Sequence, residues 1–272
     1  MALPFSRPAT LPAGFTMSRC TPADVQGMTE QYDPVMDAFA NSEHTYWWGP
    51  TPVMWAWHEE RIRRRFTDPS TQQFKVVDDA DGTIVAWAKW DPPPEMTGLA
   101  AGFVEYDATG QPVRPRERGS LGADGEDGTE RGTSGKGQAV GKLSAKSYAL
   151  GPPEGSDVAL FQEFFDGIVG MEKRYQTNKK LVLTHLCTRH SYHGRGIGAA
   201  LLRSVLEPAD REGLSAYLEA TQIGVPLYQR FGFHIVDKLE FDRTSAGFDT
   251  PATLQYVINE DQPLHRLMPS KS

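Results

Sequence analysis

The chain has 272 residues, 39% of them hydrophobic, and a formal net charge of −7 at pH 7. This size predicts one packed domain, with or without an insertion. The acidic balance argues against nucleic acid as a partner, and no apolar run is long enough to cross a bilayer. Two cysteines, Cys20 and Cys187, provide neither a disulfide framework nor a metal site. The first residues lack the apolar segment of a signal peptide, so we expect a cytoplasmic protein, as a monomer or homodimer.

The N-terminal part alternates strand and helix patterns. A strand is predicted over 14–21, followed by helical spacing from Pro22 and a second helix over 51–69. The basic run "RIRRRF" at 61–66 in that helix is interpreted as a solvent-exposed face. The clearest prediction is a β-hairpin over 72–93, because two β-rich runs flank the turn sequence "DDADG".

The composition changes between residues 98 and 157, where glycine, serine and charged residues dominate. Too few apolar side chains are present there to offset the entropy lost on ordering. The segment is therefore predicted to be a flexible, low-complexity insertion. We expect a single domain over 14–260 that contains this insertion, with tails at 1–13 and 261–272.

After the insertion, helical and strand patterns alternate again. The predicted elements are a helix over 158–178, a central apolar strand over 180–188, a helix over 196–212, a strand over 214–221, a short helix over 225–231, and strands over 232–241 and 253–258. The last strand is expected at an edge of the sheet, and Pro208 is expected to kink or shorten its helix. Strands with helices between them indicate an α/β or α+β fold.

Glycine stands at every second position, Gly194, Gly196 and Gly198, between the central strand and the next helix. Backbone N–H groups at a helix start carry partial positive charge, and glycine lets a phosphate approach them closely. Three interpretations are open: a turn without a ligand, a dinucleotide loop, or a coenzyme A pyrophosphate loop. The sequence "GRGIGA" (194–199) fits the dinucleotide pattern, with Glu219 at the expected distance. The spacer "RHSYH" before it and the short tail after it argue against that interpretation.

The stretch "LCTRHSYHGRGIGAALL" resembles the acetyl-CoA loop of the GCN5-related N-acetyltransferases, the GNAT superfamily, which runs Arg/Gln-x-x-Gly-x-Gly/Ala before a helix. His193 departs from this pattern, because it stands where the superfamily has Arg or Gln. A second block, "VPLYQRFGF" at 225–233, resembles the next motif of the superfamily at the right spacing. The combination "ADREGLSAYLEAT…LYQRFGF" resembles fungal members in particular. The resemblance is strong over 181–235 and extends to 14–92, but it does not cover the insertion.

The resemblance implies a mixed, largely antiparallel twisted sheet flanked by helices, and direct acetyl transfer from acetyl-CoA to an amine. It implies that Tyr228 protonates the leaving thiolate, since a phenol keeps its proton at neutral pH. Glu219 is our candidate for the base that takes a proton from the amine. The residues implied in acetyl-CoA binding are Leu186, Thr188, His193, Gly194, Arg195, Gly196, Gly198 and Ala199.

The acceptor is expected to be a small-molecule amine or a peptide, and no metal is expected. Its pocket is assigned to the aromatic segment 44–57 and the end of the hairpin. The candidate acceptor residues are Trp47, Trp48, Trp90 and Asp91. No role is assigned to His185 or His190, which flank the central strand. Two other functions stay open: an NAD(P) oxidoreductase, and a CoA-binding or CoA-sensing module without catalytic activity.

Overall fold

The structure is a computed structural model. It describes residues 11–29, 52–66, 71–93, 105–106, 112–113, 150–211, 213–242, 249 and 251–259. Most of the predicted insertion, nearly all of both predicted tails, and the candidates Trp47 and Trp48 lie outside these residues. Within the described ranges, no helix combines the length and apolar character needed to span a membrane.

The described elements follow the predicted alternation of strands and helices. The strands are β1 (Phe15–Arg19), β2 (Gln72–Asp78), β3 (Ile84–Asp91), β4 (Glu105–Tyr106), β5 (Pro112–Val113), β6 (Leu181–Thr188), β7 (Ala216–Thr221), β8 (His234–Phe241) and β9 (Ala252–Asn259). The helices are α1 (Val25–Thr29), α3 (Pro52–Arg65), α6 (Val158–Arg174), α7 (Ile197–Arg211) and α8 (Val225–Gln229), with short 3₁₀ turns η1 (Pro22–Asp24), η4 (Thr177–Lys179) and η5 (His190–Tyr192). The predicted hairpin is confirmed, with Gly82 at a positive φ of 76° in its turn.

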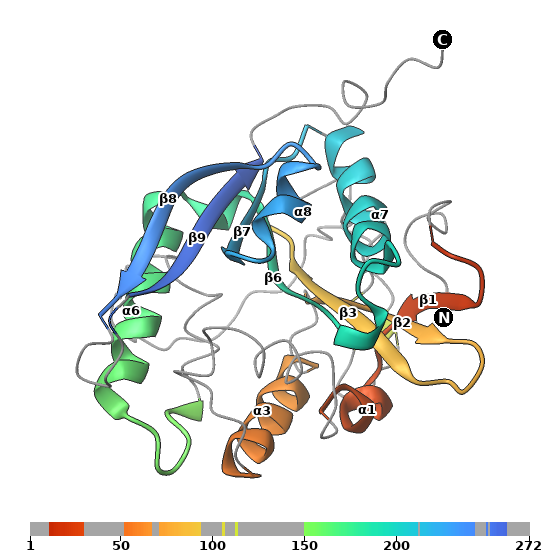
Figure 1. The fold of residues 1–272 in the computed structure, drawn as a ribbon, viewed down its shortest axis with the longest axis horizontal. Coiled ribbons are helices and arrows are strands. Elements are labelled where there is room, and N and C mark those ends of the chain that lie inside the picture. Colours follow the sequence, from red (N-terminus) through yellow and green to blue (C-terminus); the bar gives the residue numbers. More distant parts are fainter. Residues whose placement is uncertain are drawn as a thin grey trace, which may run out of the picture.

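One seven-stranded sheet forms the centre of the molecule, in the order β1-β2-β3-β6-β7-β9-β8 (Figure 1). Only β6 and β7 run parallel, so the predicted mixed, largely antiparallel sheet is confirmed. The strand predicted over 180–188 is central, as expected. The prediction that the last strand closes an edge is wrong, because β9 pairs with β7 on one side and β8 on the other.

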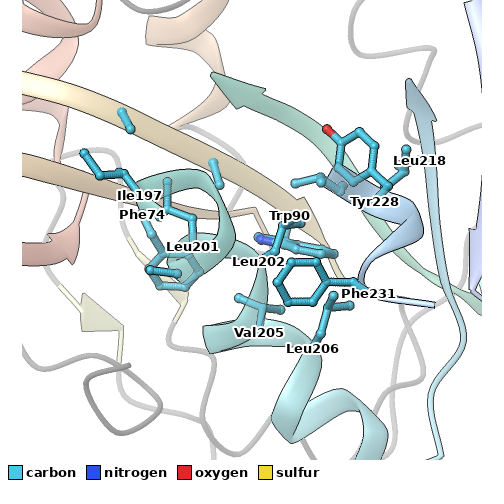
Figure 2. Packing of buried hydrophobic residues seen from close by; sticks show 14 of the residues in the cluster. Phe74, Trp90, Ile197, Leu201, Leu202, Val205, Leu206, Leu218, Tyr228 and Phe231 are labelled. Carbon is cyan, nitrogen blue, oxygen red and sulfur yellow. The ribbon is translucent and has the colours of Figure 1, made fainter. Parts of the chain in front are cut away.

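One face of the sheet packs against α7 and α8. Helix α7 presents apolar residues at a helical spacing, including Ile197, Leu201 and Val205, and these are almost completely buried. Figure 2 shows them packed against Phe74 and Trp90 of the sheet. Helix α7 continues past Pro208 to Arg211, so Pro208 does not end the helix, and the alternative of a kink stays a prediction.

Helices α1, α3 and α6 cover the opposite face. Helix α6 begins at Asp157, whose carboxylate accepts hydrogen bonds from the N–H groups of Ala159 and Leu160 at 2.9 and 3.0 Å. Its phenylalanines pack with Tyr217 and Tyr256 of the sheet, while Ile62 of α3 packs with Trp87 of β3. In Figure 1, α6 lies behind β8 and β9, and α8 lies in front of the sheet. The fold is thus three layers, with the sheet in the middle.

The parallel strands β6 and β7 stay paired only at their beginnings. Their register runs from Leu181↔Ala216 to Leu183↔Leu218 and then ends. Beyond this point β7 remains paired with β9, as far as Thr221, and β6 remains paired with β3. The two strands therefore separate, and the facing edges of 184–188 and 219–221 form no ladder with each other. This opening lies directly before the glycine loop.

Candidate active site

The glycine loop after β6 has the backbone conformation that glycine permits. Gly194 has φ 73° and Gly196 has φ 81°, a region that residues with a Cβ seldom adopt. A Cβ at either position would meet nothing within 4 Å, so conformation alone requires glycine there. Gly198 differs, because it lies inside α7 and a Cβ would only make ordinary contacts with Leu227 and Thr188.

The loop ends in a group of backbone donors without acceptors in the described part of the chain. The first bonded amide of the helix is that of Ala200, which donates to the Gly196 carbonyl at 2.9 Å. For the N–H groups of residues 194–199, the described residues offer no acceptor. These groups coincide with the positive end of the α7 dipole. The loop therefore has the donors and the field that a pyrophosphate requires.

His193 and Arg195 both turn back onto the loop rather than outward. His193 Nε2 lies 2.7 Å from the carbonyl oxygen of Thr188, which can only accept, so Nε2 carries the proton. Arg195 donates to the Ser191 carbonyl at 3.2 Å and its guanidinium lies 4.6 Å from the centre of the Tyr192 ring. Both predicted binding residues therefore stabilise the turn, and in these contacts neither forms an ion pair.

Two of the predicted binding residues lie on the open edge of β6. The Arg189 amide donates to the Val85 carbonyl at 2.8 Å, and alternate residues of an antiparallel strand bond to the same neighbour. Cys187 and His185 therefore direct their backbone groups toward β3, where they pair with Trp87 and Lys89. By the same alternation, the N–H and C=O groups of Leu186 and Thr188 point toward the opening between β6 and β7.

Tyr228 lies on α8 beside this opening. It is 8% exposed, its ring meets Phe233 edge-to-face at 5.9 Å, and the described residues offer its hydroxyl no hydrogen-bond partner. In Figure 2 the hydroxyl points away from the leucines of α7. Burial raises the pKa of Tyr228 above its ordinary value, and nearby Cys187 raises it further. The phenol consequently holds its proton, as a general acid must before it donates.

Glu219 lies on the other face of the sheet from Tyr228. It follows Leu218 on β7 and pairs with Tyr256 across the β7–β9 ladder. Burial raises the pKa of Glu219 to about 8, although the Tyr217 hydroxyl opposes the shift, and the Glu172 carboxylate adds to it. Among the described residues, Glu219 Oε1 has no hydrogen-bond partner. Glu219 is therefore a carboxyl poised to gain or lose a proton near neutral pH.

The predicted acceptor residues Asp91 and Trp90 are both buried. Asp91 is 3% exposed and its carboxylate is held by the Lys89 ammonium, by the Thr71 hydroxyl at 3.1 Å and by the Thr184 hydroxyl at 3.1 Å. Trp90 is fully buried in the cluster beneath α7. Trp90 shares this core with Ala86 and Ala88, and its place in the acceptor pocket stays a prediction.

Sequence reasoning missed a polar cluster beneath α3. Arg65 Nη2 donates to His185 Nε2 at 3.2 Å, and the His185 ring stacks on Trp87 at 5.4 Å. The basic run containing Arg65 was expected to face solvent, and this is wrong for part of it. Arg63 and Arg64 are exposed, but Arg61 and Arg65 turn toward the sheet, where Arg61 lies over the rings of Trp57 and Phe165. The i,i+4 spacing places these two arginines on one helix face, but it does not say which face packs on the sheet.

Comparison with known proteins indicates a family of acyltransferases. Residues 153–246 match a family model described as an acetyltransferase (GNAT) domain. The chain therefore carries a GNAT acetyltransferase domain and is an acyltransferase of class EC 2.3.1.-. This class implies acetyl-CoA as the co-substrate and an amine as the acceptor. Among curated proteins, none matches the chain.

Solved structures show the same fold at low identity. A mosquito arylalkylamine N-acetyltransferase-like protein is 9% identical, with a TM-score of 0.50 over 90% of this chain and 98% of that one. A Corynebacterium glutamicum structure described as histone acetyltransferase HPA2 and related acetyltransferase is 19% identical, with a TM-score of 0.49 over 94% and 99%. A putative acetyltransferase from Salmonella typhimurium, solved with acetyl-CoA, is 11% identical, with a TM-score of 0.43 over 92% and 95%. These insect and bacterial structures give no support to the fungal resemblance.

Proposed function

We propose that the protein transfers acetyl from acetyl-CoA directly to the amino group of a small molecule. The observation that carries this proposal is the row of amide donors at residues 194–199, next to the open edge of β6. Pyrophosphate at the loop would leave the pantetheine arm to run along Leu186 and Thr188, as an added strand would. That path leads to the opening beside Tyr228.

The chemistry then needs two proton transfers, which Tyr228 and Glu219 supply. The amine nitrogen bonds to the thioester carbonyl carbon, and the carbon–sulfur bond breaks. Glu219 accepts the proton that the amine loses, directly or through water, and Tyr228 donates its proton to the departing thiolate. Their raised pKa values support these assignments, because burial favours a protonated phenol and a carboxyl that exchanges its proton near neutral pH.

Several earlier predictions remain part of this proposal. The single domain over 14–260 stays a prediction, as do the roles of Trp47 and Trp48 in the acceptor pocket. The resemblance to fungal members also stays a prediction. Asp91 is now proposed to position Lys89 and Thr184 at the end of β3 rather than to touch the acceptor, because its carboxylate is already engaged.

Thiol release from acetyl-CoA, measured against a panel of small amines and peptides, tests the proposal. We expect release that depends on the amine and that equals the amount of N-acetylated product. An oxidoreductase would instead consume NAD(P)H without releasing thiol. A CoA-sensing module would bind acetyl-CoA but release no thiol with any acceptor, and either result would contradict the proposed function.

A further inference from the structure

The sheet face beneath α3 and α6 carries charges of opposite sign at its two ends. We propose that this face binds the acceptor, and that the acceptor is an amine that also carries a carboxylate, which Arg65 holds while Glu219 receives the amino group. The inference rests on the proposed function and specifies its substrate class. It also gives Arg65 a role that the transfer of acetyl alone does not require.

The positive end is built around the guanidinium of Arg65. Its Nη2 donates to His185, its plane lies 5.9 Å from the centre of the Trp87 ring, and its Nη1 has no acceptor in the described part of the chain. Burial lowers the pKa of Arg65 to about 10, which leaves it cationic at neutral pH. Arg61 and His58 lie close enough for their charges to affect the same His185 ring. A buried guanidinium with an unmatched N–H edge suits a carboxylate.

Among the described residues, no carboxylate forms an ion pair with the Arg65 guanidinium. The charge of Asp91 acts on Arg65 and raises its pKa. Asp91, however, pairs with the Lys89 ammonium and accepts from Thr71 and Thr184. Taking a cation out of water without a matched counter-charge is costly, so an anionic ligand at Arg65 would relieve that cost.

The negative end is formed by Glu219 with Glu172 nearby. Glu172, on α6, is close enough to raise the pKa of Glu219. Glu219 Oε1 and the Tyr256 hydroxyl are buried without hydrogen-bond partners in the described part of the chain, and the Tyr217 hydroxyl is close enough to Glu219 to lower its pKa. Unmatched acceptors and hydroxyls of this kind suit a primary ammonium group, which brings three donors.

From the register of the strands we infer that the two ends lie on either side of the opening between β6 and β7. Leu183 and Leu218 are the last paired residues of these strands, so Glu219 is level with Thr184, and His185 follows by one residue. Because His185 binds Arg65, the carboxylate site and the amine site lie on one face and on opposite sides of the same gap. An acceptor that spans them would present its nitrogen at the opening where the thioester is proposed to lie.

The closing experiment compares acceptors that differ only in charge. The standard L-α-amino acids and β-alanine are each tested against their own carboxamides in the thiol-release assay, with the wild type and three variants. We expect the wild type to prefer at least one free acid over its amide. Arg65→Gln should raise the KM for that acid tenfold or more, leave the KM for the amide nearly unchanged, and abolish the preference.

Two further variants separate this role from a structural one. Arg65→Lys keeps the charge but loses the planar guanidinium, whose N–H groups can bind both oxygens of a carboxylate. Its KM for the acid should therefore lie between those of the wild type and Arg65→Gln. Arg64→Gln is the matched control, because Arg64 is the adjacent residue, its side chain is 49% exposed, and it pairs with Glu60 at 2.7 Å. It should leave the preference intact. The affinity for acetyl-CoA reports that each variant is folded.

The possible failures are distinguishable. If amides or uncharged amines are acetylated as well as the free acids, or if Arg65→Gln affects acid and amide equally with unchanged acetyl-CoA affinity, the inference is overturned and the proposed function stands. If no amine or peptide supports thiol release, the proposed function fails and the inference fails with it.

Discussion

At the scale of single residues, the candidate site contains carboxyl groups in contrasting environments. Asp91 is held by an ammonium and two hydroxyl groups, which stabilise its charge and leave no oxygen free of bonding. Glu219 has an oxygen without a partner in the described structure and a pKa raised by burial. Residues with perturbed pKa values in such surroundings are candidates for proton transfer, and this contrast favours Glu219 over Asp91 as the base.

Tyr228→Phe tests the acid. The variant keeps the ring that packs on Phe233 but loses the proton donor. We expect kcat to fall by about 10²-fold with little change in the KM for acetyl-CoA, because general acid catalysis contributes about 10²- to 10⁴-fold. Tyr175→Phe, which removes a hydroxyl that binds Asp237 at 3.0 Å, is the matched control and should keep its activity. Unchanged turnover in Tyr228→Phe under conditions where chemistry limits the rate would remove Tyr228 from the mechanism.

Glu219→Gln tests the base through the pH dependence of kcat/KM. A base works only when deprotonated, and burial raises the pKa of Glu219 to about 8. The wild-type value should therefore rise with pH through the neutral range and level off above about 8. The glutamine variant should be slower and should lose this ionisation, keeping only the pH dependence that the amine itself contributes. An identical profile in both enzymes would show that another group accepts the proton.

At the scale of elements, the site depends on how β6 leads into α7. The strand stays paired with β3 while β7 leaves it, and the glycine loop then turns the chain into the helix. Ile197 is 1% exposed and anchors the first turn of α7 in the core. This anchoring fixes the direction of the free N–H groups, so the loop is organised before a ligand binds.

Gly196→Ala tests whether the loop conformation serves binding. Alanine at φ 81° is strained by about 1–2 kcal/mol, and relaxing that strain should redirect the neighbouring amides. We expect acetyl-CoA to bind at least tenfold more weakly, as measured by calorimetry. Gly213→Ala is the matched control, since Gly213 has φ 65° with open space around its Cβ position and lies beyond the far end of α7. It should lose similar stability but keep its affinity, and equal losses of affinity in both variants would contradict the account.

Local sequence patterns predicted most of the helices and strands. Features that depend on contacts between distant segments were not predicted. The helix expected over 196–212 is observed over Ile197–Arg211, because apolar spacing and the preceding glycines mark it clearly. The place of β9 between β7 and β8 was not predicted, since strand order depends on contacts between distant segments. The inward turn of Arg61 and Arg65 was missed for a similar reason. A run of basic residues does not reveal which side of its helix the sheet will cover.

At the scale of the whole molecule, the three layers separate the two substrates of the proposed reaction. The proposed donor site lies at the start of α7, on one side of the sheet, and the proposed acceptor site lies beneath α3 and α6 on the other. The opening between β6 and β7 connects them. The proposed donor site rests on a local motif, because its glycines have a conformational role. The proposed acceptor site instead combines residues of α3, α6, β6 and β7 that are far apart in the sequence.

A calorimetric titration of the whole protein with acetyl-CoA, with NADPH as the competing candidate, tests the central claim most directly. We expect one acetyl-CoA site per chain, competition by free CoA, and no measurable binding of NADPH. Binding of NADPH together with no binding of acetyl-CoA would contradict it, because the amides of the glycine loop would then hold a different pyrophosphate.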